Sequence, residues 1–547
     1  MKKSLKFLCV LMAAGIAAGA AGCSNKVPDT EETLEVYCRD AGYGYAWCEA
    51  LLDAFKQQDW VQQKYPNLQV AFDQNQVASY AESKLKSGAE ANTIDLFFAT
   101  GGYELAGVDS KGNDYLADLT EYVYGQNVPG ENVLFIDKVQ DSYNTSNLYH
   151  DVTATTDKDT YYFVSWADGM DGILYNADIL ESLGIPVPVT TDEWLASMRK
   201  IKDLQGNQEG KYSVGYSILQ SNDAPNYVDY MFYIWWAQYE GIDNYLDFFN
   251  GIDSGRYSSG IFDQVGRVEA LKVLEQAVNK TNDYVNPTSF TDEYLISQTE
   301  FLRGKAVYHM NGDWFDNEMR EIKEEIKQVN GLDYDIQMMR TPVISSIVTQ
   351  TPSVQALAKT RGITEDAALR LVIEAVDSGA DSYEGVTAPD FERIREARSI
   401  VHSIGPNHTA FIPSYATGKE VAMDFLRFMA TDIANEIYIE ATGGATLPFL
   451  YNVKEKNPQL YESLSDFQKT RIGYFTDENV GLYVLPSENS FPLVLYGGVM
   501  PFTTQNYYIT FSMSGNTKMP QNYFDDTKAY WTDARWQDAL AKAGIVG

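Results

Sequence analysis

The sequence predicts an α/β protein with mostly parallel sheets and more than one domain. Strand-like and helix-like segments alternate three times between Leu34 and Ala99, which is typical of a parallel sheet covered by helices. The chain has 547 residues, whereas a single hydrophobic core rarely serves more than about 300 residues. We therefore expect two or three domains. Hydrophobic residues make up 45% of the chain and aromatic residues 13%, which indicates a globular protein and excludes a disordered one.

Residues 1–22 have the features of a signal peptide. Three lysines in the first six residues precede an apolar stretch at 7–16 that is too short to span a bilayer stably. Small residues then lead directly to Cys23, and the arrangement looks like a lipoprotein signal. We expect Cys23 to carry acyl chains such as palmitate, followed by a tether at 23–33; several chains would give a stable anchor. Ordinary cleavage beside an incidental cysteine is the alternative.

Charge and cysteine content limit the partners. The formal net charge is −34, which opposes binding to nucleic acid and anionic lipid and leaves neutral or cationic ligands. Cys38 and Cys48, the two cysteines outside residues 1–23, could form a disulfide in an oxidising compartment or remain buried thiols. The four histidines are scattered, so we expect no metal site and no cofactor.

Three polar loops follow the strands expected before residue 100. Ligands of parallel sheets collect beyond the carboxyl ends of the strands. These ends carry Tyr43 between two glycines, Gln74 within the polar run 73–76, and Tyr103 after two glycines. We regard the three residues as candidate ligand contacts, with plain connecting turns as the alternative. Neither glycine pair has the spacing of a nucleotide-binding loop.

The segment from Tyr161 to Lys202 predicts two strands around an acidic turn, followed by two capped helices. Trp166, Asp168 and Asp171 lie at the turn, where they could form one wall of a binding site. Asn176 is a suitable cap for the first helix. Thr190, with Glu193 three residues later, is a capping-box pattern for the second.

Two further regions supply aromatic candidates. A helix expected within 227–241 carries Trp235 and Trp236 among several tyrosines; most of these rings should be core, and at least one should line a cleft or a domain contact. A strand over 305–310 precedes a turn, where Asp313 could cap a helix and Trp314 could present its ring to a cleft.

Five segments of the sequence resemble segments of a known protein family. They are YPNLQVAF, YLADLTEY, GILYNADILESLGIPVPVTTDEW, FLRGKAVYHMNGDW and GKEVAMDFLRFMATDIANEIYIEATGGATLP. Together with the lipoprotein signal, they resemble the extracellular solute-binding proteins of ABC importers, specifically the family 1, maltose-binding-protein-like group that takes up sugars and oligosaccharides. The likeness covers about two-thirds of the chain. Residues 349–403 and the last hundred residues match poorly, and their roles stay open.

The resemblance implies two α/β lobes with a ligand cleft between them, joined by crossing segments. Carried over, lobe one comprises 34–160 plus 311–410, and lobe two comprises 161–310 plus 411–547. The function implied is that of a lipid-anchored, monomeric receptor on the extracellular face of the membrane. It would capture a carbohydrate, with an oligosaccharide as the expected ligand, by hinge closure and pass it to ABC permease subunits.

Sugar chemistry agrees with the candidate residues, because a pyranose offers apolar faces to aromatic rings and a rim of hydroxyls to planar acceptors. We expect Trp166 and Trp314 to stack on sugar rings and Asp168 or Asp171 to accept hydroxyl hydrogen bonds. The remaining candidates for the ligand site are Tyr43, Gln74, Tyr103, Trp235, Trp236 and Asp313.

Other functions remain as alternatives. In a secreted glycoside hydrolase, Asp168 and Asp171 would be the acid and the nucleophile, but two carboxylates on one short turn would lie on the same side of a substrate. The sequence has no G-x-S-x-G or H-E-x-x-H motif. We therefore expect no enzymatic activity. A polysaccharide-binding surface adhesin is a third reading. For a solute-binding protein, amino acids, peptides and metals are alternative ligands, and Arg39 could hold the carboxylate of an amino acid.

Overall fold

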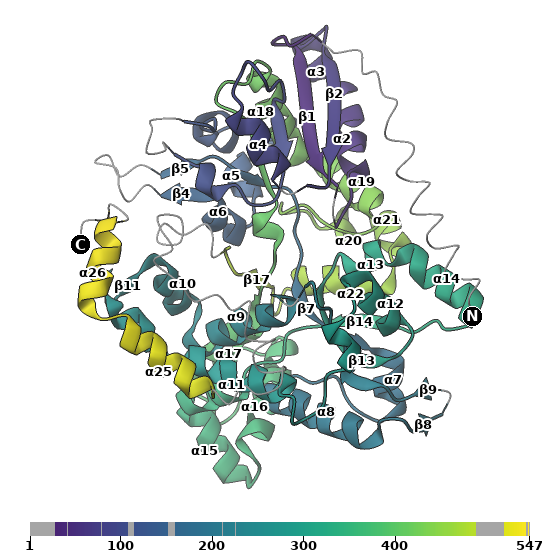
Figure 1. Ribbon diagram of the computed structural model, residues 1–547, viewed down its shortest axis with the longest axis vertical. Helices are drawn as coiled ribbons and strands as arrows, with labels where there is room; N and C mark the ends of the chain where they lie inside the picture. The colour runs from purple at the N-terminus through teal and green to yellow at the C-terminus, as the bar shows by residue number, and fades with distance from the viewer. Residues whose placement is uncertain are drawn as a thin grey trace.

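Two sheets divide the structure into two lobes, one above the other in Figure 1. The computed structural model describes residues 28–40, 42–77, 79–107, 114–150, 159–210, 212–224, 226–487, 519–542 and 545. The expected signal peptide and Cys23 lie outside these residues. No helix of the described part is both long and apolar enough to cross a membrane.

Lobe one is built on a five-stranded sheet in the order β2-β1-β3-β16-β6. Its first three strands are parallel, and β16 is antiparallel to β3 and β6. The strands are β1 (Thr33–Arg39), β2 (Gln69–Asn75), β3 (Leu96–Phe98), β6 (Val164–Ser165) and β16 (Thr409–Phe411). The helices around it are α2 (Ala46–Lys56), α3 (Asp59–Lys64), α4 (Tyr80–Lys86), α5 (Phe135–Lys138), α6 (Asp141–Asn147), α18 (Lys419–Met429), α19 (Asp432–Thr442), α20 (Val453–Lys456) and α21 (Pro458–Ser463).

Lobe two is built on a four-stranded sheet in the order β10-β13-β7-β14. Its strands are β7 (Asp171–Asn176), β10 (Tyr216–Ile218), β13 (Ala306–Gly312) and β14 (Ile336–Met339). Its helices are α7 (Ala177–Ser182), α8 (Thr191–Leu204), α9 (Asn226–Glu240), α10 (Ile242–Asn250), α11 (Gly266–Val278), α12 (Tyr294–Leu302), α13 (Phe315–Glu318), α14 (Arg320–Asn330), α15 (Pro352–Arg361), α16 (Glu365–Asp377), α17 (Ala388–Ser399) and α22 (Asp466–Phe475). This sheet is also mixed, because β10 runs parallel to β13, whereas β7, which enters from the junction, runs antiparallel to β13 and β14.

Small paired strands and short helices complete the two lobes. The paired strands are β4 (Leu148–His150) with β5 (Asp159–Tyr161), β8 (Gln208–Glu209) with β9 (Tyr212–Ser213), β11 (Ile252–Asp253) with β12 (Arg256–Tyr257), and β15 (Ile400–Val401) with β17 (Tyr483–Val484). The short helices are η1 (Tyr103–Leu105), η2 (Thr120–Tyr124), η3 (Ser259–Asp263), η4 (Pro287–Phe290), η5 (Ser345–Gln350) and η6 (Gly405–Asn407).

Local signals in the sequence account for the helix pair α7 and α8. The Asn176 side chain accepts a hydrogen bond from the Ile179 amide, and the Thr190 hydroxyl accepts one from the Glu193 amide, so both predicted caps are confirmed. On α8, the apolar face buries Trp194 and Met198. Capping fixes where each helix begins, and burial fixes which face turns inward.

The strand pairing corrects the predicted lobe boundaries. Of residues 311–410, expected in lobe one, β16 joins the lobe-one sheet, whereas β14 pairs with β7 of lobe two. Residues after 411 were assigned to lobe two, yet α18 and α19 follow β16 of the lobe-one sheet, and the Phe55 ring of α2 packs against Phe425 and Phe428 of α18. The sequence does not reveal these boundaries because pairing between strands hundreds of residues apart leaves no local trace in it.

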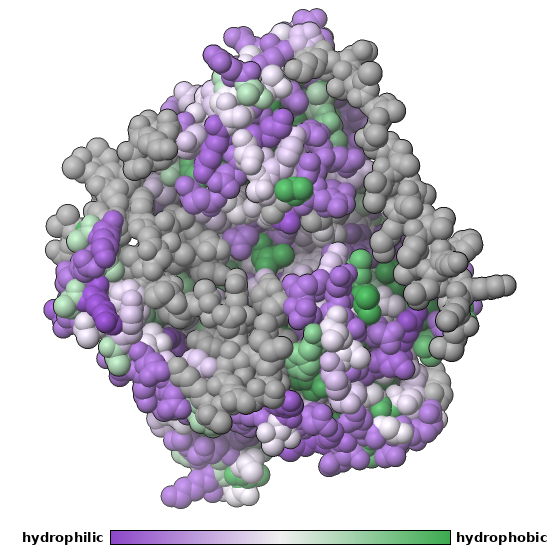
Figure 2. Space-filling model, in the orientation of Figure 1, coloured by the Kyte–Doolittle hydropathy of each residue, from purple (hydrophilic) through white to green (hydrophobic). Residues whose placement is uncertain are grey.

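Most of the described helices in the poorly matching regions lie in lobe two. Helix α16 is tied to α8 by an Arg370–Glu193 ion pair of 2.7 Å. Near the C-terminus, α25 (Pro520–Tyr530) and α26 (Asp533–Lys542) lie along one side of lobe two (Figure 1). There the rings of Trp531 and Phe262 stack with centroids 5.2 Å apart. On the face shown in Figure 2, the described surface of both lobes is mostly hydrophilic, in keeping with the high net charge.

Candidate functional site

Three backbone segments lie side by side at the junction of the lobes. Residues 165–171 cross from β6 to β7, and residues 402–408 cross from β15 to β16. Backbone amides tie the first segment to the second and to a third that follows α19. Asp171 donates to His402 O (2.8 Å), Trp166 to His408 O (3.0 Å), and Asp168 to Thr446 O (2.8 Å). Side chains of the first segment are therefore fixed where both lobes meet.

Asp168 is the centre of a buried polar network. Its carboxylate accepts hydrogen bonds from the Tyr143 hydroxyl (2.9 Å), the Gln140 amide (3.0 Å) and the Thr446 hydroxyl (3.3 Å). Burial raises the pKa of Asp168, opposed by the nearby Arg471 charge and by these hydrogen bonds. All the donors come from lobe-one elements or from the segment after α19, so Asp168 anchors the crossing segment to lobe one.

Asp313 links the two lobes directly. It lies just after β13 of lobe two and accepts a hydrogen bond of 2.8 Å from the hydroxyl of Tyr43 in lobe one. The guanidinium of Arg471 stands 2.7 Å from the same carboxylate and also donates to the Thr446 hydroxyl. Burial raises the pKa of Asp313 to about 6, although Arg471 and Tyr43 act in the opposite direction. The predicted capping role of Asp313 is wrong, because Trp314 occupies the cap position of α13 and the Asp313 carboxylate is engaged by Arg471 and Tyr43.

Gly169 allows this contact to form. A β-carbon at this position would stand 2.7 Å from an Asp313 carboxylate oxygen and 2.9 Å from the Tyr43 hydroxyl. Such distances are too short for any side chain without displacement of the pair. The close approach of Asp313 and Tyr43 to the backbone therefore explains why position 169 is a glycine.

Tyrosines of α9 and Trp314 form what we call the aromatic face, consisting of Tyr227, Tyr230, Tyr233 and Trp314. The ring of Trp314 lies 5.7 Å from that of Tyr227. Tyr230 and Tyr233 stack on the ring of His402, whose Nδ1 is 2.7 Å from an oxygen of Asp171. Glu318 lies close by on α13, and burial raises its pKa to about 7. Rings and carboxyl groups therefore converge beside the Tyr43–Asp313 contact.

Three predicted tryptophans belong to the core. Trp166 stacks on Trp47 at 5.0 Å and donates to Ala99 O. Trp235 packs beside Trp194 and donates to Pro342 O, while Trp236 donates to Gln264. All three side chains are at most 1% exposed. Their rings already have protein partners on their faces or edges, which removes them from the candidate set.

The two remaining loop candidates do not join the network. Tyr103 is buried and donates to Pro406 O of the second crossing segment at 2.6 Å, so it supports the junction without facing the aromatic face. Gln74 is exposed on the edge strand β2. Of the two alternatives for the cysteines, the structure shows the second: Cys38 and Cys48 are buried free thiols.

Residues that sequence reasoning missed complete the site. Arg471, His402, Gln140 and Tyr143 each contact a predicted aspartate from a distant part of the chain. Arg471 on α22 is fully buried. Nothing in the sequence of this helix distinguishes a buried arginine from an exposed one. Within the described residues, no group of three or more His, Cys, Asp or Glu side chains is arranged to hold a metal ion.

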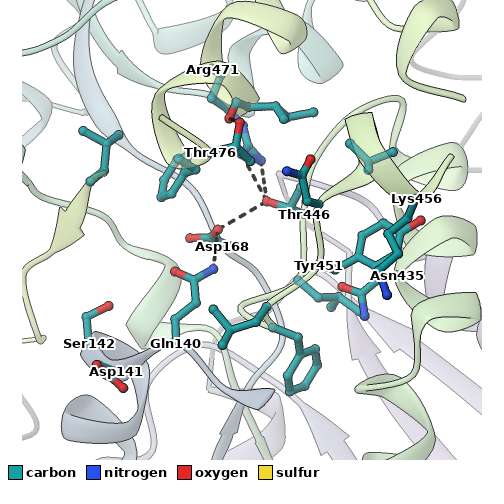
Figure 3. A pocket seen from close by; sticks show the side chains of 18 of the residues that line it. Gln140, Asp141, Ser142, Asp168, Asn435, Thr446, Tyr451, Lys456, Arg471 and Thr476 are labelled. Atoms are coloured by element: carbon teal, nitrogen blue, oxygen red, sulfur yellow. Dashed lines mark hydrogen bonds between the residues drawn. The ribbon is translucent and has the colours of Figure 1, made fainter. Parts of the chain in front are cut away.

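A pocket of about 660 Å³ lies beside this network, and we call it the hinge pocket. Its lining includes Gln140 and Asp168 at the junction, Thr446 after α19, and Arg471 on α22 (Figure 3). Of the ten ligand contacts predicted from the sequence, Asp168 alone lines it. The Arg471 guanidinium separates the pocket from Asp313, since it contacts Thr446 on one side and Asp313 on the other.

Comparisons with known proteins agree with this architecture. A model of the family described as bacterial extracellular solute-binding protein matches residues 43–436. A comparison with curated proteins found no match. A solved structure from work on xylan utilization by Caldanaerobius polysaccharolyticus is similar with a TM-score of 0.53 at 13% identity, covering 91% of this chain and 100% of that one.

Two further structures show the same fold. The ABC substrate-binding protein Lmo0181 from Listeria monocytogenes, solved with cycloalternan, has a TM-score of 0.52 at 13% identity and covers 94% of this chain and 99% of its own. A chitin oligosaccharide binding protein has a TM-score of 0.53 at 12% identity, covering 93% and 99%. The two-lobed α/β fold predicted from the sequence is confirmed. The family match extends over most of the chain, which therefore belongs to the bacterial extracellular solute-binding proteins.

Proposed function

We propose that this protein captures a carbohydrate, specifically an oligosaccharide, between its lobes and delivers it to the permease subunits of an ABC importer. In this proposal Cys23 carries the lipid anchor, the protein acts as a monomer on the extracellular face of the membrane, and it has no catalytic activity. The observation that carries the proposal is the hydrogen bond between Tyr43 of lobe one and Asp313 of lobe two. Trp314 is the residue that follows Asp313 in the sequence.

The chemistry of this region suits a sugar. Aromatic rings pack against the C–H faces of a pyranose, and carboxylates accept hydrogen bonds from its hydroxyls. The aromatic face supplies the rings, and Asp313, Asp171 and Glu318 supply the acceptors. Two of the structurally similar proteins are described with oligosaccharides, cycloalternan and chitin oligosaccharide, which favours the same ligand class for this chain.

Hinge motion would give the ligand access. Tyr43, Asp313 and Trp314 are at most 6% exposed, so the lobes are closed on each other at this contact. A ligand entering beside Trp314 would replace the Tyr43–Asp313 hydrogen bond with bonds of its own, and the crossing segments would bend to admit it. Closure around the bound sugar would then bury its apolar faces.

A glycoside hydrolase is the weaker alternative. Its two catalytic carboxylates must face a sugar bond from opposite sides. Asp168 is held by Gln140, Tyr143 and Thr446, whereas Asp171 is paired with His402. Both carboxylates are therefore engaged by protein groups at successive points of one crossing segment.

Isothermal titration calorimetry with malto-, xylo- and chito-oligosaccharides tests the proposal. We expect one of these series to bind and Trp314→Ala to weaken its binding roughly tenfold or more, the usual effect of removing a central aromatic anchor. Trp60→Ala, which removes a half-buried tryptophan of lobe one, should leave the affinity unchanged.

Two results would contradict the proposal. One is wild-type protein that binds none of the three series. The other is a folded Trp314→Ala protein with unaltered affinity. Thin-layer chromatography of the same mixtures should show no new products, and the appearance of shorter sugars would favour the hydrolase.

A further inference from the structure

The hinge pocket has the size of a small-molecule site. Its volume of about 660 Å³ lies within the range of about 300–1,000 Å³ found for ligand pockets. It is not the place where Tyr43, Asp313 and Trp314 meet, since none of the three lines it. We propose that the hinge pocket is a second ligand site, distinct from the aromatic face, which takes a small neutral polyol or monosaccharide.

The walls of the pocket come from both lobes. On the lobe-one side, residues 446–453 are held to the segment around α5 and α6, because Gln140 N donates to Pro448 O and Leu450 N donates to Lys138 O. On the lobe-two side, α22 is held to β14 by the Tyr474 hydroxyl, which donates to Met338 O at 3.2 Å. The pocket thus spans the hinge.

The lining offers both kinds of surface that a polyol needs. At the floor, Gln140, Asp168, Thr446 and Arg471 form one connected set of hydrogen bonds (Figure 3). Their positions are fixed by bonds to one another, so a hydroxyl entering the pocket meets oriented donors and acceptors. Apolar and aromatic side chains form the walls, among them Phe449, Tyr451 and Phe475.

Charge in the lining argues against an anionic ligand. Its two cations are engaged already, since Arg471 pairs with Asp313 and Lys456 pairs with Asp432 at 2.7 Å. Asp141 and Glu478 add two exposed carboxylates at the rim, one from each lobe. Among the described lining residues, a phosphate or carboxylate would therefore find no uncommitted cation, whereas a neutral polyol gains hydrogen bonds without a charge penalty.

Occupancy of the pocket would be coupled to the aromatic face. The Arg471 guanidinium contacts Thr446 in the pocket and Asp313 next to the aromatic face, and the distance between the pocket walls depends on the angle between the lobes. A pocket ligand that binds better at one lobe angle shifts the protein toward that angle. It then changes the affinity for the oligosaccharide, and the oligosaccharide changes the affinity for the pocket ligand by the same factor. This coupling rests on the hinge closure proposed above; the existence of the second site does not.

Saturation-transfer difference NMR on the full chain tests the second site, with D-glucose, D-xylose, myo-inositol and glycerol as probes. We expect transfer to at least one probe in the wild type and in Trp314→Ala. We expect its loss in Thr476→Trp, which fills the pocket from the end of α22, and in Leu450→Trp, which narrows the pocket from a residue that is 60% exposed. The matched control is Thr360→Trp, because both threonine hydroxyls donate to a carbonyl four residues earlier.

Three outcomes would overturn the second site: no transfer to any probe in the wild type, loss of transfer in Trp314→Ala, or unchanged transfer in the folded Leu450→Trp protein. Leu450→Trp keeps the test decisive if Thr476→Trp does not fold, because residue 450 is mostly exposed. Calorimetry of the wild type with oligosaccharides tests the proposed function independently of the second site. An absence of oligosaccharide binding would count against the proposed function, not against the second site.

Discussion

The two halves of the segment from Tyr161 to Lys202 are held in place by different kinds of contact. The helix half, α7 and α8, begins at caps whose hydrogen bonds join residues three positions apart. The crossing half, residues 165–171, is held by partners far along the chain. Asp171 contacts His402, 231 residues away, and Asp168 contacts Thr446, 278 residues away.

This difference separates scaffold from junction. A capped helix depends on its own sequence and loses about 1 kcal/mol when a cap is removed. A buried ionic network depends on every member, because removal of one partner leaves another charge buried without compensation. Substitutions in the two halves should therefore differ severalfold in their effect on stability, and they provide a direct test of the comparison.

The largest effect is expected for Arg471→Met. Arg471 is fully buried against Asp313, and its removal leaves Asp313 and Asp168 without a neighbouring cation. We expect a loss of about 3–5 kcal/mol in the free energy of unfolding, the usual result of breaking a buried ion pair. Urea denaturation followed by circular dichroism measures it.

The double variant Arg471→Met/Asp313→Asn is the control for this experiment. It removes the orphaned carboxylate and should restore more than half of the lost stability. A loss below about 1 kcal/mol in the single variant, or a double variant no better than the single one, would show that the pair does not hold the junction.

A pH-dependent effect of intermediate size is expected at His408, in the second crossing segment. Burial lowers the pKa of His408 to about 3, with the Arg39 charge adding to the effect. In the unfolded chain the same imidazole titrates near 6.5. The unfolded state therefore binds a proton below pH 6.5 that the folded state refuses. Stability should fall as the pH drops from 6.5 toward 3, by about 1.4 kcal/mol per pH unit for this residue.

Comparison of the wild type with His408→Gln isolates this contribution. Burial also lowers the pKa of His309, to about 4, and raises that of Asp95 to about 6, so the slope of the wild type alone mixes opposite effects. Between pH 6 and 5, the wild type should lose about 1 kcal/mol more stability than the variant. Equal slopes for the two proteins would mean that His408 is protonated in the folded state.

The same contrast explains how much of the molecule could be predicted. The caps at Asn176 and Thr190 follow from neighbours in sequence, and the structure has them as expected. The placement of β14 in lobe two does not, because pairing of distant strands is decided by the whole sheet. At the junction, the sequence indicates Asp, Tyr and Trp residues as candidates. It does not indicate Arg471 and His402, because only the fold brings them to the junction. The sequence does not distinguish core tryptophans from cleft tryptophans, because a ring has the same sequence signal in either place.

The smallest effect is expected in the helix half, for Thr190→Ala. The Thr190 hydroxyl accepts from the Glu193 amide at the start of α8 and also interacts with Asp366 of α16. Its loss should cost about 1–2 kcal/mol, at the upper end for a cap, because the site is buried. Thr190→Ser keeps the hydroxyl and should cost much less. Oligosaccharide affinity should be unchanged in both variants, measured by the calorimetry used for Trp314→Ala. If Thr190→Ala instead destabilised the protein as strongly as Arg471→Met, the helix half would be part of the same cooperative network, and the division between scaffold and junction would fail.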